Sequence, residues 1–156
     1  MKSTKILFVC LGNICRSPAA EGVMKMLGKG LPIEIQSAGT AGYHIGELPD
    51  TRMRSHAQKR GYNLTSRAQQ FNPAFHFEQF DYIIAMDENN LRDLKSMDRT
   101  KQFHHKLSLM SDYSQKMDVT GVPDPYYGGP EGFEHVLDIL EDACVGLLKQ
   151  LKAQGS

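Results

Sequence analysis

The sequence has no tryptophan, only three cysteines and no excess of charge of either sign. Eighteen basic residues balance eighteen acidic ones, so the chain lacks the broad attraction that binders of nucleic acids and anionic membranes use. Three cysteines cannot all pair, and no N-terminal segment has the pattern of a signal peptide. We therefore expect a cytoplasmic protein with no nucleic-acid or membrane partner, in which any anion site is local.

Long hydrophobic runs are missing as well. The longest, residues 6–11, is far shorter than the roughly 20 residues that a helix needs to cross a bilayer. The apolar share of 40% and the charged share of 23% are those of a globular protein, so a core can be buried. At 156 residues we expect one domain spanning residues 1–156.

Motifs for nucleotides and metals are also absent. A kinase or nucleotide hydrolase would need a Gly-x4-Gly-Lys-Ser/Thr loop, which the sequence does not contain. The six histidines have no ligand spacing such as His-Glu-x-x-His, and we expect the adjacent His104 and His105 on a solvated helix. We expect neither a metal nor another cofactor.

What the sequence does contain is an alternation of strand-like and helix-like segments. The βαβα order with right-handed crossovers predicts an α/β fold, a three-layer sandwich with a central four-stranded parallel sheet and helices on both faces. An irregular stretch from Ser111 to Gly132 predicts a long, ordered loop. The predicted strands are 5–10, 33–36, 82–86 and 106–110, and the predicted helices begin at 17, span 50–60, include Leu91 and Leu94, and extend from Phe133 to Leu151.

A candidate phosphate loop, Cys-Leu-Gly-Asn-Ile-Cys-Arg-Ser at residues 10–17, lies between the first predicted strand and the first predicted helix. Open α/β sheets present ligands to a helix N-terminus at this position. Successive backbone N–H groups can point inward, Gly12 gives the backbone freedom, and the helix dipole favours negative charge. The segment therefore predicts a phosphate site directly after the first strand.

The side chains of this loop suit nucleophilic attack on phosphorus. A helix N-terminus and the nearby Arg16 favour the thiolate form of Cys10. The planar Arg16 guanidinium can hold two phosphoryl oxygens. We expect Asn13 to support the loop, and Ser17 to hydrogen-bond the thiolate and to cap a helix whose first residue is Pro18. The alternative is that Cys10 is only a buried thiol at a strand end.

A general acid should face the thiolate, because expulsion of a phenolate needs a proton. Asp124 is the candidate, within Pro-Asp-Pro-Tyr-Tyr-Gly at residues 123–128, where prolines stiffen the backbone and Tyr126 and Tyr127 can form an aromatic slot. The alternative is an ordinary turn, for which this composition is also suitable.

The segments 10–17 and 124–128 together resemble the low-molecular-weight protein tyrosine phosphatase family, and the resemblance extends over nearly the whole chain through segments 37–40, 80–83 and 86–91. It implies hydrolysis of phosphotyrosine through a cysteinyl-phosphate intermediate. Cys10 would be the nucleophile, Arg16 the phosphate clamp, and Asp124 the acid that later activates water. Phosphotyrosine proteins and small aryl phosphates would be the substrates.

The resemblance also implies a binding set, a cognate tyrosine kinase as partner, and a monomer or weak dimer. Many relatives have Trp in place of Tyr43, and a number have a His, bonded to the loop asparagine, in place of Ser66, so substrate preference and loop anchoring are expected to differ. Ser37 would lie behind the loop. The implied phosphate- and substrate-binding residues are Leu11, Gly12, Asn13, Ile14, Cys15, Ser17, Tyr43, Tyr126 and Tyr127.

Cys15 has two interpretations: by the resemblance, a reversible disulfide with Cys10, and otherwise simple packing. Cys144 is expected in the core. A thiol-dependent arsenate reductase would need resolving cysteines between Cys15 and Cys144, and there are none. Phosphoarginine phosphatases of the family tend to have Thr where Ile14 stands. A phosphate-binding module without turnover would lack the nucleophile or the acid, and Cys10 and Asp124 are both present.

Overall fold

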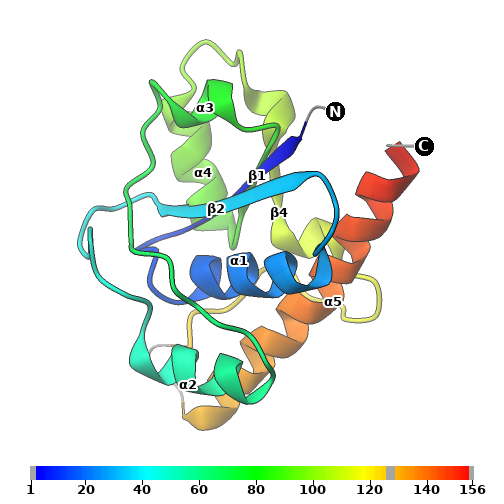
Figure 1. Cartoon of the computed structure of the whole chain (residues 1–156). Coiled ribbons are helices and arrows are strands. Elements are labelled where there is room, and N and C mark those ends of the chain that lie inside the picture. Colours follow the sequence, from blue (N-terminus) through cyan, green and yellow to red (C-terminus); the bar gives the residue numbers. More distant parts are fainter. Residues whose placement is uncertain (1–2, 126–128, 155–156) are drawn as a thin grey trace.

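The computed structural model describes residues 3–125 and 129–154. A parallel sheet in the order β2-β1-β3-β4 forms its centre, and helices cover both faces (Figure 1). The predicted α/β fold is thereby confirmed. The strands are β1 (Thr4–Cys10), β2 (Ile33–Gly39), β3 (Tyr82–Ala85) and β4 (Leu107–Leu109), and the helices are α1 (Arg16–Leu27), α2 (Thr51–Lys59), α3 (His76–Gln79), α4 (Glu88–Met97) and α5 (Pro130–Gln154), with 3-10 turns η1 (His104–Lys106) and η2 (Met110–Tyr113).

Strand β1 is an uninterrupted apolar run because both of its faces are covered. Alternate side chains of a strand point to opposite faces of the sheet. Ile6, Phe8 and Cys10 accordingly join the core cluster that contains buried residues of α1 and α5, whereas Leu7 and Val9 join the cluster on the side of α3 and α4. Parallel strands enclosed in this way have no polar face, which explains the lack of alternation in the sequence.

The sheet order places a ligand site at one end of β1. The chain leaves β1 to form β2 on one side and later forms β3 on the other. In open α/β sheets, ligands bind outside the carboxyl ends of strands at such a reversal of strand order. Cys10 ends β1 at this point, and the connection after β3 begins beside it, since the Met86 N–H donates to the Val9 carbonyl at 2.9 Å.

Helix α5 holds the connection from β4 to α5, which contains Asp124. A side-chain carbon on Gly146 would lie 1.9 Å from the Tyr113 carbonyl oxygen, so only glycine lets η2 approach α5 this closely. One turn earlier, the Asp142 carboxylate accepts hydrogen bonds from the backbone N–H groups of residues 115, 116 and 117. The connection from β4 to α5 is thereby fixed against the helix.

Two local predictions were wrong. Ser17 does not cap α1, which begins at Arg16 after the cap residue Cys15, because the Ser17 hydroxyl bonds other side chains; Pro18 is accordingly not the first helical residue. His104 is not on a solvated helix: it lies in the 3-10 turn η1, and its Nδ1 is 2.6 Å from the buried carboxylate of Asp98 after α4, whereas His105 is exposed.

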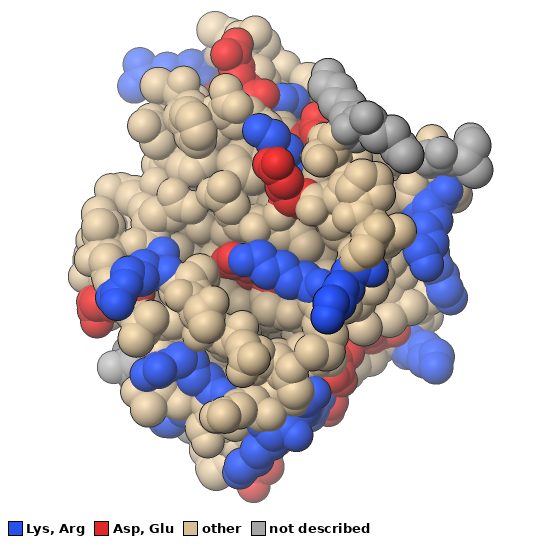
Figure 2. All heavy atoms as spheres, in the orientation of Figure 1, with Lys and Arg blue, Asp and Glu red and all other residues tan. Residues whose placement is uncertain are grey.

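The surface carries both signs of charge, and Figure 2 shows basic and acidic side chains interspersed over one face. Within the described ranges, no helix is both long enough and apolar enough to span a bilayer. The same part of the chain contains no group of three His, Cys, Asp or Glu side chains that could hold a metal ion.

Candidate active site

The loop between β1 and α1 is held from outside through its carbonyl groups. In a trans peptide the carbonyl and the following N–H point in opposite directions. Because the carbonyls point outward to partners, the following N–H groups point to the inner side of the loop, an arrangement that suits an anion. The outward bonds run from Thr40 N–H to the Cys10 carbonyl at 2.9 Å, from Ala41 N–H to Leu11 at 2.9 Å, and from Asp50 N–H to Ile14 at 2.6 Å.

Asn13 supports the loop from behind, as predicted. Its φ of 57° is left-handed, a conformation that asparagine adopts more readily than most residues. Its Nδ2 donates to Ser17 Oγ at 2.8 Å, and its Oδ1 accepts from the Gln69 N–H at 2.9 Å. Among the described residues its side-chain partners are these two and not Ser66. The Gln69 side chain in turn donates to the carbonyl of the buried Ser37 at 2.9 Å.

Gly39 is required by the close approach of β2 to the loop. A side-chain carbon there would lie 2.7 Å from the Leu11 carbonyl oxygen and 3.1 Å from the Asn13 nitrogen. Any other residue would displace the loop backbone. The sequence gives no sign of this contact, because it joins two segments that become neighbours only in the folded sheet.

Cys10 is 2% exposed, and its Sγ lies 2.9 Å from Ser17 Oγ. The Ser17 hydroxyl, which bonds Asn13 as well, therefore connects the thiol to the support of the loop. The sulfur stands at the N-terminal end of α1, where the helix dipole favours negative charge. The predicted contact between Ser17 and Cys10 is confirmed, although the predicted helix cap is not.

Arg16 is 4% exposed and is held by a carboxylate that the sequence analysis did not identify. Its Nη1 donates to Asp87 Oδ2 at 2.6 Å and to the Val122 carbonyl at 3.1 Å. Burial disfavours the charged guanidinium, but the nearby Cys10 and Asp87 outweigh it and raise the pKa of Arg16. Asp87 follows β3 and caps α4 through the Asn90 N–H at 2.8 Å, a capping pattern that could have marked it.

One cavity of about 300 Å³ brings the predicted groups together. Asp124 reaches it from the connection between β4 and α5, which is anchored at Val122 by a 2.7 Å hydrogen bond from its N–H to the Met86 carbonyl. Asn13 and Ser17 lie buried behind the loop, and Tyr126 and Tyr127 lie outside the described residues. The cavity is lined by Cys10, Leu11, Gly12, Ile14, Cys15, Arg16, Tyr43, His44, Asp50 and Asp124.

Comparison with known proteins identifies the family of the chain. A family model described as low molecular weight phosphotyrosine protein phosphatase matches residues 5–156. The chain belongs to this family. A Synechocystis protein whose name marks it as a candidate low molecular weight protein-tyrosine-phosphatase is 52% identical over 151 residues, which cover 94% of this chain and 96% of the relative.

Solved structures of the phosphatase family match over the same length. A crystal structure of a protein tyrosine phosphatase from Entamoeba histolytica, with Hepes in the active site, has a TM-score of 0.93 and 44% identity and covers 99% of this chain and 100% of that chain. A structure named as a Drosophila arginine phosphatase has a TM-score of 0.88 and 30% identity, and the match covers 96% of this chain and 98% of that chain.

Two residues that line the cavity of this phosphatase, His44 and Asp50, were not predicted from the sequence. The His44 ring lies against the loop, since a side-chain carbon on Gly12 would be 3.0 Å from its Cδ2. Asp50 caps α2 by accepting from the Arg52 and Met53 N–H groups. Burial opposes ionisation of Asp50, yet its hydrogen bonds with Arg52 and Met53 hold its pKa below the usual value. The sequence marked Asp50 only as a helix start.

The three cysteines of this family member are free thiols. Cys15 lines the same cavity as Cys10, and burial together with the charge of Cys10 raises its pKa, so that it is protonated at neutral pH. Cys144 is fully buried in the cluster around α5, which confirms its predicted place in the core.

Proposed function

We propose that the chain hydrolyses phosphotyrosine in proteins, and small aryl phosphates, through a cysteinyl-phosphate intermediate on Cys10. The observation that carries this proposal is the convergence of Cys10, Arg16 and Asp124 on one cavity at the N-terminus of α1. Membership of the phosphotyrosine phosphatase family supports the substrate class.

In the first step the Cys10 thiolate attacks phosphorus. The new sulfur–phosphorus bond forms while the bond from phosphorus to the phenolic oxygen breaks, and its electron pair leaves with that oxygen. Asp124 transfers its proton to the leaving oxygen, so tyrosine departs as a neutral phenol. The loop N–H groups and Arg16 stabilise the negative charge on the three non-bridging oxygens in the transition state.

In the second step Asp124, now a carboxylate, accepts a proton from a water molecule that attacks phosphorus. The sulfur–phosphorus bond breaks, its electron pair returns to Cys10, and inorganic phosphate leaves. Ser17 Oγ, 2.9 Å from Sγ, donates a hydrogen bond that stabilises the departing thiolate. Asp87 and the Val122 carbonyl keep Arg16 aimed at the phosphate throughout.

The residues that line the cavity favour phosphotyrosine over phosphoarginine, and the cysteines argue against arsenate reduction. Leu11 and Tyr43 flank the cavity and suit an aromatic ring, and Ile14 occupies the wall position where arginine phosphatases tend to have threonine. An arsenate reductase would need resolving cysteines downstream of Cys15, and Cys144, which lies there, is fully buried in the core.

The proposal also covers the compartment, the oligomeric state and the partner of the enzyme. The three free thiols suit a reducing cytoplasm. We propose that the chain acts there as one domain, a monomer or weak dimer, on phosphoproteins made by a cognate tyrosine kinase.

The role of Asp124 predicts a dependence on the leaving group. We expect Asp124→Asn to lower kcat/KM by about a thousandfold for phosphotyrosine, whose phenol is a poor leaving group, and far less for p-nitrophenyl phosphate. The measurement is kcat/KM over a series of aryl phosphates. Asp118→Asn, a change of the same kind earlier in the connection between β4 and α5, serves as control. Equal losses for all leaving groups would show that Asp124 is not the proton donor.

A further inference from the structure

The rim of the cavity exposes more apolar surface than a tyrosine ring needs. Large apolar side chains gather in residues 43–48 and in the adjoining phosphate loop, and clusters of this kind mark binding surfaces. The 43–48 segment adjoins the cavity, since Tyr43 and His44 line it. The exposed fractions are 76% for Tyr43, 61% for Ile45, 44% for Leu11 and 40% for Leu48.

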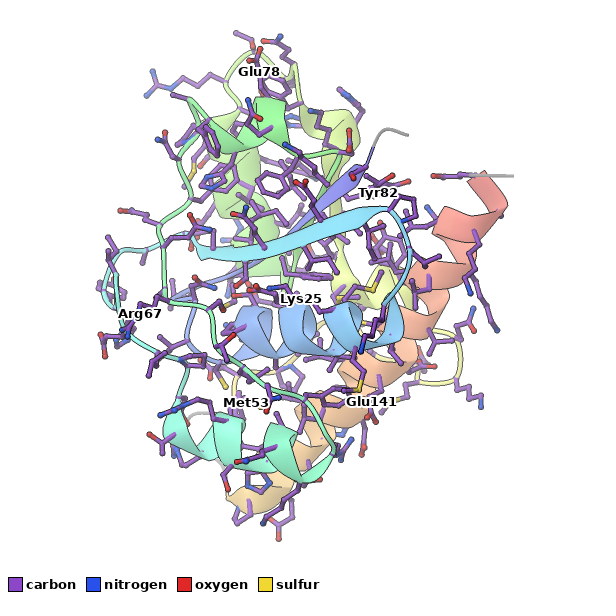
Figure 3. The ribbon with its side chains drawn as sticks, in the orientation of Figure 1. Lys25, Met53, Arg67, Glu78, Tyr82 and Glu141 are labelled. Carbon is purple, nitrogen blue, oxygen red and sulfur yellow. The ribbon has the colours of Figure 1, made fainter. Side chains whose placement is uncertain are left out.

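An arginine from a distant part of the sequence lies across the same segment. The Arg67 side chain is exposed, and its Nη1 donates to the Gly46 carbonyl at 2.9 Å. Backbone bonds between Ala68 and residues 46 and 47, each 2.8 Å long, hold the two segments together. Figure 3 shows Arg67 at the edge of the molecule, beside the connection from β2 to α2.

The charge of Arg67 is not neutralised by this part of the protein. Its hydrogen bond is to a backbone carbonyl, and no carboxylate among the described residues forms an ion pair with it. Of the nearby acidic groups, Asp50 is paired with Arg52 at 3.1 Å, and Glu47 lies 2.8 Å from His44 Nδ1. Figure 2 shows basic and acidic side chains together on this side of the molecule. Arg67 is therefore a cation at the rim of the cavity that no described carboxylate pairs with.

We propose that Leu11, Tyr43, Ile45, Leu48 and Arg67 form a docking rim for the substrate segment beside the phosphotyrosine. An acidic residue of that segment pairs with Arg67, and an apolar residue packs on Ile45 and Leu48. The inference rests on the proposed function. Two observations select this occupant: the rim is continuous with the cavity, and the Arg67 guanidinium, which pairs with no described carboxylate, complements an acidic peptide.

The test compares two phosphotyrosyl peptides that differ only in having Glu and Asp, or Gln and Asn, beside the phosphotyrosine. For the wild type at low ionic strength, we expect kcat/KM for the acidic peptide to be about threefold that for the neutral one, and added salt to reduce this ratio. Arg67→Gln should bring the ratio to about one through KM. Arg67→Lys should keep most of this ratio, because it keeps the positive charge. A role of Arg67 that depended only on its hydrogen bond to the Gly46 carbonyl would not give this result. Arg99→Gln, at an exposed site beyond α4, should leave it unchanged.

A second variant tests the apolar part of the rim. Ile45→Ser should raise KM for both peptides about fivefold relative to that for p-nitrophenyl phosphate, which has no flanking residues. A wild-type ratio of one, or a ratio that Arg67→Gln does not change, would overturn the docking rim. So would a concentration-dependent dimer that Ile45→Ser dissociates, because the rim would then bind a second copy of the chain. Failure of the proposed function is distinct, since the wild type would then not hydrolyse p-nitrophenyl phosphate.

Discussion

Replacing Cys10 by serine is expected to abolish phosphotyrosine turnover, with a loss of about 10⁴-fold or more in kcat. Serine has nearly the same shape, but its hydroxyl is a far weaker nucleophile than a thiolate at neutral pH. The anion site should survive, because it is formed by loop N–H groups and by Arg16, which Asp87 and the Val122 carbonyl hold in place.

The measurement pairs steady-state turnover with calorimetric titration of inorganic phosphate or tungstate. Cys10→Ser should bind these anions with an affinity within about tenfold of the wild type, a difference of less than about 1.4 kcal/mol. Cys144→Ala is the control for loss of a thiol, since Cys144 lies in the core and away from the cavity. Turnover by Cys10→Ser at a rate near that of the wild type would rule out the mechanism.

Arg16→Lys is expected to produce the second largest effect, a loss of about a thousandfold in kcat/KM. A lysine ammonium cannot hold two phosphoryl oxygens with a planar pair of donors. The shorter reach of lysine would also weaken the contacts with Asp87 and Val122, and these contacts link the phosphate loop to the segment that contains Asp124. Both the charge stabilisation and the position of the acid are therefore affected.

A matched control for this change is Arg60→Lys. Arg60 lies at the end of α2 and pairs with Glu134, Asp138 and Glu141 of α5, away from the cavity. Its replacement should lower the melting temperature with little effect on kcat/KM. If Arg16→Lys lost activity only in proportion to its stability, or by less than about tenfold, Arg16 would be a structural residue and not the phosphate clamp.

The fold could be predicted from the sequence because its main signals are local. The apolar run of β1 and the apolar stripe of α5 each depend on residues close together in the chain, and both elements form where they were expected. The short helix α3 and the 3-10 turns were missed because segments of three or four residues are too short to show periodicity. Strand β2 extends to Gly39 because its last residues pair with β1, a long-range contact.

The candidate site was predictable where one motif contains the chemistry and not where distant segments meet. Residues 10–17 indicated the loop, but the contact of Asp87 with Arg16 joins segments that follow different strands, β3 and β1. Ser17 was assigned as a helix cap from its general preference for that position, yet in the fold its hydroxyl is taken by Cys10 and Asn13. Position 66 lacks the histidine that a number of relatives have there. This absence does not indicate that the Gln69 N–H anchors Asn13 instead, because that contact also joins distant segments.

Trapping the covalent intermediate would show whether Cys10 carries the phosphoryl group. We would mix Asp124→Asn enzyme with p-nitrophenyl phosphate in excess chelator, quench within milliseconds, and locate the phosphoryl group by peptide mass spectrometry. In this variant the good leaving group should still be expelled, whereas hydrolysis of the intermediate should be slow, so phosphate should accumulate on Cys10. Turnover with no phosphorylated cysteine, or with the phosphoryl group on another residue, would show that Cys10 is not the nucleophile.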